Sequence, residues 1–167
     1  MKQIEDWTGL KYGNILFDSE IDNWERYTSV FNDRIVGKKQ LIFLIEENEG
    51  EKFGYYCNTE IVHQSNEWIP TDSQSFHFNL FSNERLPKPM KFEVINPNCC
   101  GYCLSDQSFV YLIEIGDIHL YKVNQKDECY CEQHDDRFDY HGFEDALCGN
   151  SPGKPFDLKK MVIIQMK

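Results

Sequence analysis

The chain contains 167 residues, which is enough for one ordinary domain with its own core. Hydrophobic residues make up 41% and aromatic residues 14% of it, a composition that excludes intrinsic disorder and favours β-strands. The formal net charge of −11 opposes binding to nucleic-acid phosphates. We therefore expect no direct nucleic-acid binding, whereas an acidic surface suits a basic protein partner.

Two features of the sequence concern its cellular location. The longest apolar run, residues 41–45, is too short for a transmembrane helix, and residues 1–6 lack the apolar stretch of a signal peptide. The seven cysteines are an odd number, which argues against a disulfide framework. We therefore expect a reducing compartment, the cytoplasm or the nucleus, with reduced thiols and no membrane insertion.

Residues 20–37 have the pattern of an amphipathic helix. The stripe at three- and four-residue spacing consists of Ile21, Trp24, Thr28, Phe31 and Ile35. Asp22 with Glu25 three positions later resembles a capping box, and Gly37 suits a left-handed helix end. This pattern predicts one long helix.

The period then changes from 3.6 to 2, which indicates strands. Residues 41–45 form an apolar run, Glu49-Gly50 suits a turn, and residues 52–59 follow as the returning strand of a hairpin. Gly54 inside that strand indicates a bulge or a close backbone approach.

Further strands are predicted at residues 75–81, 90–95, 109–115, 117–123 and 158–166. In the first of these, Phe76, Phe78 and Leu80 point to one face, and His77 and Asn79 to the other. Gly116 alone separates the strands 109–115 and 117–123, which indicates a tight kink or hairpin. Residues 127–145 carry eight acidic side chains and are predicted to be a solvated loop.

About seven short strands, one clear helix and no alternating βαβ pattern predict a fold of the mainly β (α+β) class. We expect a two-sheet antiparallel β-sandwich flanked by one or two helices. The predicted core consists of Trp24, Phe31, Phe43, Phe53, Phe76, Phe78, Phe92 and Ile163.

The cysteines form the sharpest cluster of reactive residues. Zinc prefers four soft ligands from pairs two to four residues apart; Cys100 with Cys103, and Cys131 with His134, have that spacing. Cys129 and Cys131 share one face of an alternating segment, which suits core residues as well as ligands. Because only one true Cys-x-x-Cys is present, we expect no metal and no cofactor.

The cysteines also raise the question of a redox or nucleophilic role. The segment with Cys99, Cys100 and Cys103 suits exposure, but no basic residue adjoins it to favour a thiolate. A nucleophilic cysteine also needs a base, and the sequence offers His119 on a strand's outer face, with His134 and His141 in the acidic loop. None lies in a known catalytic motif, so no catalytic residue is predicted.

The order of the elements resembles a known family. The amphipathic segment with Trp24 is followed by the apolar strand 41–45, Phe-Gly-Tyr-Tyr at 53–56 and Ser-Phe-x-Phe at 75–78. Ile-Gly-Asp-Ile-His-Leu-Tyr at 115–121 and a closing strand after Phe156 complete the pattern. From about residue 17 the chain resembles a TLD (TLDc) domain, the C-terminal module of oxidation-resistance proteins and of some TBC- and LysM-containing proteins.

The chain differs from the usual pattern at two places. Only Gly116 remains of a glycine-rich stretch, and Met-Val-Ile-Ile-Gln at 161–165 replaces the usual Leu-Glu-Val-Trp ending. We therefore treat it as a divergent stand-alone member, with residues 1–16 as an N-terminal extension and 17–167 as the TLD-like domain.

The resemblance implies a β-sandwich without an established catalytic centre. It implies a non-enzymatic interaction module linked to oxidative-stress resistance or to binding of vacuolar proton pump subunits. Two alternatives stay open at this point. One is a Cys/His-dependent redox or hydrolytic enzyme, and the other is a nuclear transcription co-regulator, a role that some family members have.

Overall fold

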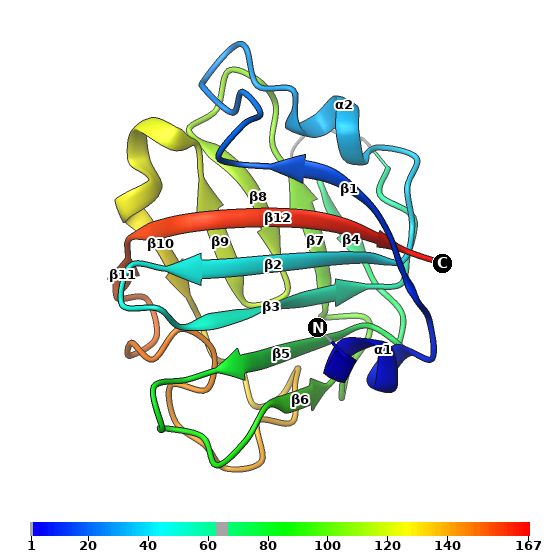
Figure 1. Ribbon diagram of the computed structural model, residues 1–167, viewed down its shortest axis with the longest axis vertical. Helices are drawn as coiled ribbons and strands as arrows, with labels where there is room; N and C mark the ends of the chain where they lie inside the picture. Colours follow the sequence, from blue (N-terminus) through cyan, green and yellow to red (C-terminus); the bar gives the residue numbers. More distant parts are fainter. Residues whose placement is uncertain (1, 63–66) are drawn as a thin grey trace.

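A computed structural model describes residues 2–62 and 67–167. It confirms the predicted class, because the described residues form two antiparallel six-stranded sheets packed face to face (Figure 1). The strands of the second sheet run steeply across those of the first.

The first sheet contains, in spatial order, β1 (Tyr12–Asp18), β12 (Leu158–Met166), β2 (Leu41–Glu47), β3 (Lys52–Cys57), β5 (Phe76–Phe81) and β6 (Met90–Glu93). The second contains β11 (Pro155–Phe156), β10 (Cys129–Cys131), β9 (Ile118–Tyr121), β8 (Tyr111–Ile115), β7 (Gly101–Leu104) and β4 (Trp68–Pro70). The helices are α1 (Lys2–Thr8), α2 (Phe31–Ile35) and the 3₁₀ segment η1 (Val123–Glu128). None of the described helices is long and apolar enough to span a membrane.

The predicted hairpin β2–β3 is confirmed and forms the centre of the first sheet. Gly50 makes the turn with φ +96°, a backbone conformation that favours glycine. Gly54 marks a close backbone approach, since a Cβ there would lie 1.8 Å from the Phe43 carbonyl oxygen. β12 pairs with β2 and also with β1, so the C-terminal strand lies inside the sheet.

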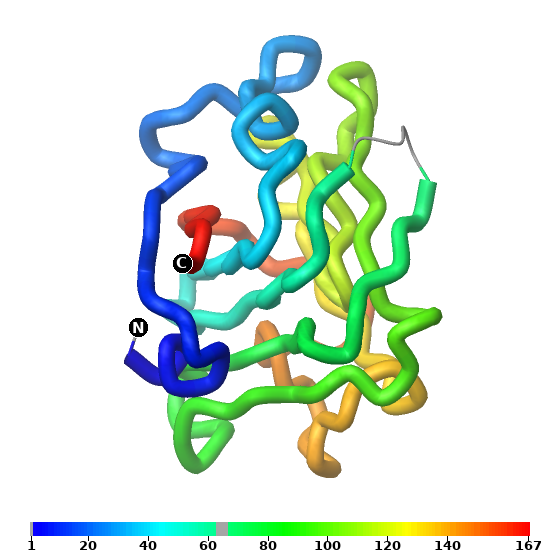
Figure 2. The backbone as a smooth tube through the Cα atoms, turned by 90° about the vertical axis from the view of Figure 1, so that its right-hand side faces the viewer, coloured from blue at the N-terminus to red at the C-terminus, as the bar shows by residue number. Residues whose placement is uncertain are grey.

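The apolar residues form two clusters, one between the sheets and one on the outer face of the first sheet. The chain of α1, dark blue in Figure 2, lies beside the first sheet. The outer cluster lies under this helix, whose Ile4 is fully buried and whose Trp7 contacts Phe76 edge to face. All eight residues of the predicted core are buried, which confirms the assignment.

The side chains of β5 alternate between the two faces of the first sheet. The predicted alternation is correct, but Phe76 and Phe78 belong to the outer cluster beneath α1. His77 and Asn79 are also buried, on the opposite face of the strand. Both faces of β5 are therefore covered, and its two polar side chains need hydrogen-bond partners inside the protein.

The long helix predicted over residues 20–37 is wrong. Only α2 is helical in this segment, and Ile21 is 83% exposed. Short polar side chains bond the neighbouring backbone instead, as where Asn23 Oδ1 accepts from the Glu25 N–H and Ser29 Oγ from the Phe31 N–H. Such local bonds compete with the hydrogen bonds of a helix. The spacing of the apolar residues therefore predicted a longer helix than the chain forms. Gly37 does follow the helix end, with φ +74°.

Three further predictions concern the number of strands, the acidic stretch and the domain boundary. The described residues form twelve strands rather than about seven. The acidic stretch 127–145 is not wholly a loop, because it contains β10. The expected boundary between residues 16 and 17 falls inside β1, where Phe17 pairs with Ile163 of β12.

Candidate functional site

A buried polar cluster lies at the turn between β8 and β9. Gly116 has φ +56°, and a Cβ there would lie 2.2 Å from His77 Nε2, so both backbone and space demand glycine. Asp117 follows with no exposed surface. The Gly-Asp pair between two strands thereby places a carboxylate in the interior.

His77 joins the two sheets at this point. Its Nε2 accepts from the Asp117 N–H (2.8 Å), so the neutral ring carries its proton on Nδ1, which donates to the Gly54 carbonyl (3.2 Å). Burial lowers the pKa of His77 to about 4, although the nearby Asp117 acts in the opposite direction.

We expect His77 to make the protein less stable as the pH falls. Because its folded pKa, about 4, lies below the unfolded value of 6.5, the unfolded chain binds more protons between these two pH values. The free energy of unfolding should drop across this window by up to roughly 3 kcal/mol from His77 alone.

Urea unfolding of wild type and His77→Gln between pH 7 and pH 4 measures this contribution. The amide of glutamine offers an NH2 donor group and a carbonyl acceptor but does not titrate, so the variant should lose less stability on acidification. Equal losses in the two proteins would contradict the assignment.

The Asp117 carboxylate accepts several hydrogen bonds. Oδ2 accepts from the His134 N–H and from the Tyr140 hydroxyl, both at 2.8 Å, and Oδ1 from His134 Nδ1 at 3.0 Å. Arg137 Nη1 lies 3.7 Å from Oδ1. Burial raises the pKa of Tyr140 well above its usual value, so this hydroxyl stays a donor. We name Asp117, His77, His134, Arg137 and Tyr140 the Asp117 cluster.

A cavity of about 450 Å³ adjoins the Asp117 cluster on the outer face of the second sheet. His119 lines it and stacks on Tyr130, with ring centroids 4.3 Å apart. Its Nε2 lies 3.5 Å from Glu132, and its ring lowers the pKa of Glu114. His119 therefore lies on the outer face of its strand, as its alternation with buried Ile118 and Leu120 predicts.

The structure separates most of the cysteines singled out from the sequence. Cys99 is exposed and lines the same cavity, whereas Cys100 is buried and donates to the Arg137 carbonyl. Cys103 is half-buried on β7, three residues along an extended segment from Cys100. Side chains alternate along a strand, so this spacing directs the two sulfurs to opposite faces.

Cys129 and Cys131 are buried at the two ends of β10, and His134 belongs to the Asp117 cluster. Within residues 2–62 and 67–167 no group of three or more potential ligands is arranged to hold a metal ion. In the same ranges no cysteine sulfur is hydrogen-bonded to a histidine. The Asp117 carboxylate orients His134, a contact that the sequence does not reveal.

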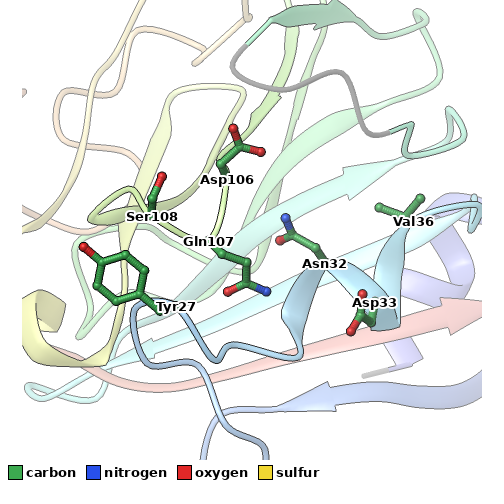
Figure 3. A pocket seen from close by; sticks show the side chains of 7 residues that line it. All are labelled: Tyr27, Asn32, Asp33, Val36, Asp106, Gln107 and Ser108. Atoms are coloured by element: carbon green, nitrogen blue, oxygen red, sulfur yellow. The ribbon is translucent and has the colours of Figure 1, made fainter.

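A groove of about 730 Å³ opens at one end of the sandwich, between α2 with its preceding turn and the β7–β8 loop (Figure 3). The lining residues are Tyr27, Asn32, Asp33, Val36, Asp106, Gln107 and Ser108. We call it the end groove. It carries two carboxylates and an aromatic ring, and the guanidinium of Arg26 lies 4.9 Å from the centroid of that Tyr27 ring and donates to the Ser108 carbonyl.

The walls of the end groove are held in place by buried bonds. The ammonium of buried Lys122 donates to the carbonyls of residues 106, 107 and 109, which fixes the β7–β8 loop. Tyr27 has φ +73° and donates its N–H to the Gln107 carbonyl. A tyrosine is rarely found in this conformation, and such strain persists only where the surroundings impose it.

Sequence reasoning missed both sites. Asp117 is 40 residues from His77 and 23 residues from Tyr140 along the chain. Their contacts arise only from the packing of the two sheets. The Gly-Asp pair at 116–117 was the local signal available for this cluster. The end groove had no such signal, because residues 27–36 fall in the predicted helix and residues 106–108 lie in a segment without a predicted element.

Models of known protein families and the curated proteins were compared with this chain, and neither comparison finds a match.

Proposed function

We propose that the chain is a non-enzymatic protein-interaction module and that the end groove is its binding surface. The observation that carries the proposal is an open groove whose walls are held by buried bonds and whose rim displays Tyr27, which is 64% exposed. Aromatic residues on rigid supports are typical anchors of protein interfaces.

The charge of the groove favours a basic segment of the partner. Asp33 and Asp106 line the groove, and the chain as a whole carries a net charge of −11. Such a field accelerates association with a basic partner and is screened by salt.

The resemblance to TLD domains supplies the partner to be tested first. On that resemblance, we propose that the groove binds a subunit of the vacuolar proton pump and that the module contributes to oxidative-stress resistance. A nuclear co-regulator role would use the same groove with a different basic partner.

Pelleting of the purified chain with membranes that carry the pump tests this proposal. We expect binding at low salt that weakens at high salt and falls at least about tenfold in Tyr27→Asn and Asp33→Asn, since lost interface anchors cost more than 1.4 kcal/mol. Asparagine tolerates positive φ, so Tyr27→Asn removes the ring without adding strain.

Two matched variants serve as controls. Glu128→Gln removes one exposed negative charge away from the groove, and Phe81→Ser removes one exposed aromatic ring on β5. Both should bind as wild type does. Absence of pump binding would contradict the pump assignment, and equal binding by the groove variants and the controls would contradict the groove.

A further inference from the structure

Two cysteines far apart in the sequence meet in the interior. Cys131 ends β10, and Cys148 lies in the segment that leads from β10 to β11. The two thiols lie close enough for each to shift the pKa of the other, upward for Cys131 and downward for Cys148. Both residues also line one small cavity, together with Glu132, Leu147, Asn150 and Pro152.

Four of the other five cysteines bond to different groups. Cys57 and Cys100 donate to backbone carbonyls, Cys129 accepts from the Tyr121 N–H, and Cys99 accepts from the Asn96 amide. None of these four hydrogen bonds joins two cysteines, whereas Cys131 and Cys148 face the same small cavity.

The backbone on both sides of this pair is fixed. The Asn79 amide donates to the carbonyls of Ala146 and Leu147, directly before Cys148. The Gln133 side-chain carbonyl accepts from the Ala146 N–H, and the Cys131 carbonyl accepts from the Gly153 N–H at 2.8 Å. The fold thus holds the two sulfurs together, and little further entropy is lost when they react with each other.

The two thiols are chemically unequal. Contact with the Cys131 side chain lowers the pKa of Cys148, while burial raises that of Cys131 well above its usual value. The sulfur that ionises more readily is the better-populated nucleophile. Cys148 is 5% exposed and Cys131 3%, so only a small neutral oxidant would reach them without unfolding.

We propose that Cys131 and Cys148 are a modification site, at which a peroxide converts the two thiols into a reversible disulfide. The Cys148 thiolate attacks one oxygen of hydrogen peroxide and the O–O bond breaks, which leaves a sulfenic acid and releases hydroxide. The Cys131 sulfur then attacks the Cys148 sulfur, the S–O bond breaks, and the thiol proton leaves with the departing hydroxide as water. The thiols lose two electrons and the peroxide gains two.

The disulfide closes a loop of the chain between β10 and β11 that carries His134, Arg137 and Tyr140 of the Asp117 cluster. A crosslink of this kind restricts the unfolded chain, so the oxidised protein should melt about 5–10 °C above the reduced one. Dithiothreitol should reverse the shift.

Peptide mapping under non-reducing conditions identifies the bond. The protein is treated with hydrogen peroxide in a Cys99→Ser background, which removes the exposed thiol, and free thiols are alkylated after unfolding. Trypsin places Cys129 and Cys131 in one peptide, residues 127–137, and Cys148 in another. We expect these two peptides to be linked and to separate on reduction.

Cys129→Ser is the matched control, because Cys129 is also buried on β10 and lies in the same peptide. The link should persist in Cys129→Ser and disappear in Cys131→Ala and Cys148→Ala. Full alkylation of Cys131 and Cys148 after peroxide treatment, or a link that survives in Cys131→Ala, would overturn the proposal. If an alanine variant does not fold, the peptide map of the Cys99→Ser protein by itself tests the proposal.

Discussion

Replacing Phe78 with alanine is expected to lower the free energy of unfolding by roughly 3–5 kcal/mol, because the ring is fully buried in the outer cluster beneath α1. Phe78 pairs with Gly54 on β3, and its ring tip would lie 2.8 Å from a Cβ placed there. The ring fills the space that the glycine leaves open, so truncation creates a cavity at the centre of the sheet.

Urea denaturation followed by far-UV circular dichroism measures this loss. Phe81→Ala is the matched control, because Phe81 lies on the same strand but is 52% exposed, and its effect should stay within about 1 kcal/mol. A loss below about 1.5 kcal/mol for Phe78→Ala would show that α1 does not enclose this ring.

Replacing Asp117 with alanine is expected to cost a similar amount, roughly 3–5 kcal/mol, through a different mechanism. The substitution removes the acceptor of the Tyr140 hydroxyl and of two His134 donors, and it leaves the positive charge of Arg137 near an apolar side chain. Buried donors left without partners each cost about 1–3 kcal/mol.

Asp117→Asn refines this measurement. The asparagine side chain has one acceptor oxygen and adds a donor that faces other donors, so we expect an intermediate loss of roughly 2–3 kcal/mol. Exposed Asp136 supplies the control, since Asp136→Asn should change stability by less than about 0.5 kcal/mol. An Asp117→Ala protein as stable as this control would contradict the structural role of the cluster.

The sequence alone determined the features that depend on local alternation. The hairpin β2–β3 and the strand β12 followed from short apolar or alternating runs, and so did the burial of Phe43, Phe53 and Ile163. A strand buried on one face alternates, and one buried on both faces is a continuous apolar run of a few residues. The class of two antiparallel sheets followed from the presence of several short strands without an alternating βαβ pattern.

The tertiary structure decided which face of a strand points inward and which segments meet. Alternation in β5 separates Phe78 from His77, but only α1 on one side and Asp117 on the other explain why both are buried. The periodicity over residues 20–37 predicts a helix. Local hydrogen bonds from polar side chains to the backbone instead stabilise the turns that border the end groove.

The meeting of Asp117 with His77, and of Cys131 with Cys148, likewise depends on packing across long sequence separations. No periodicity encodes such contacts, because they arise from how the sheets and their loops fit together rather than from the residues adjacent in the chain.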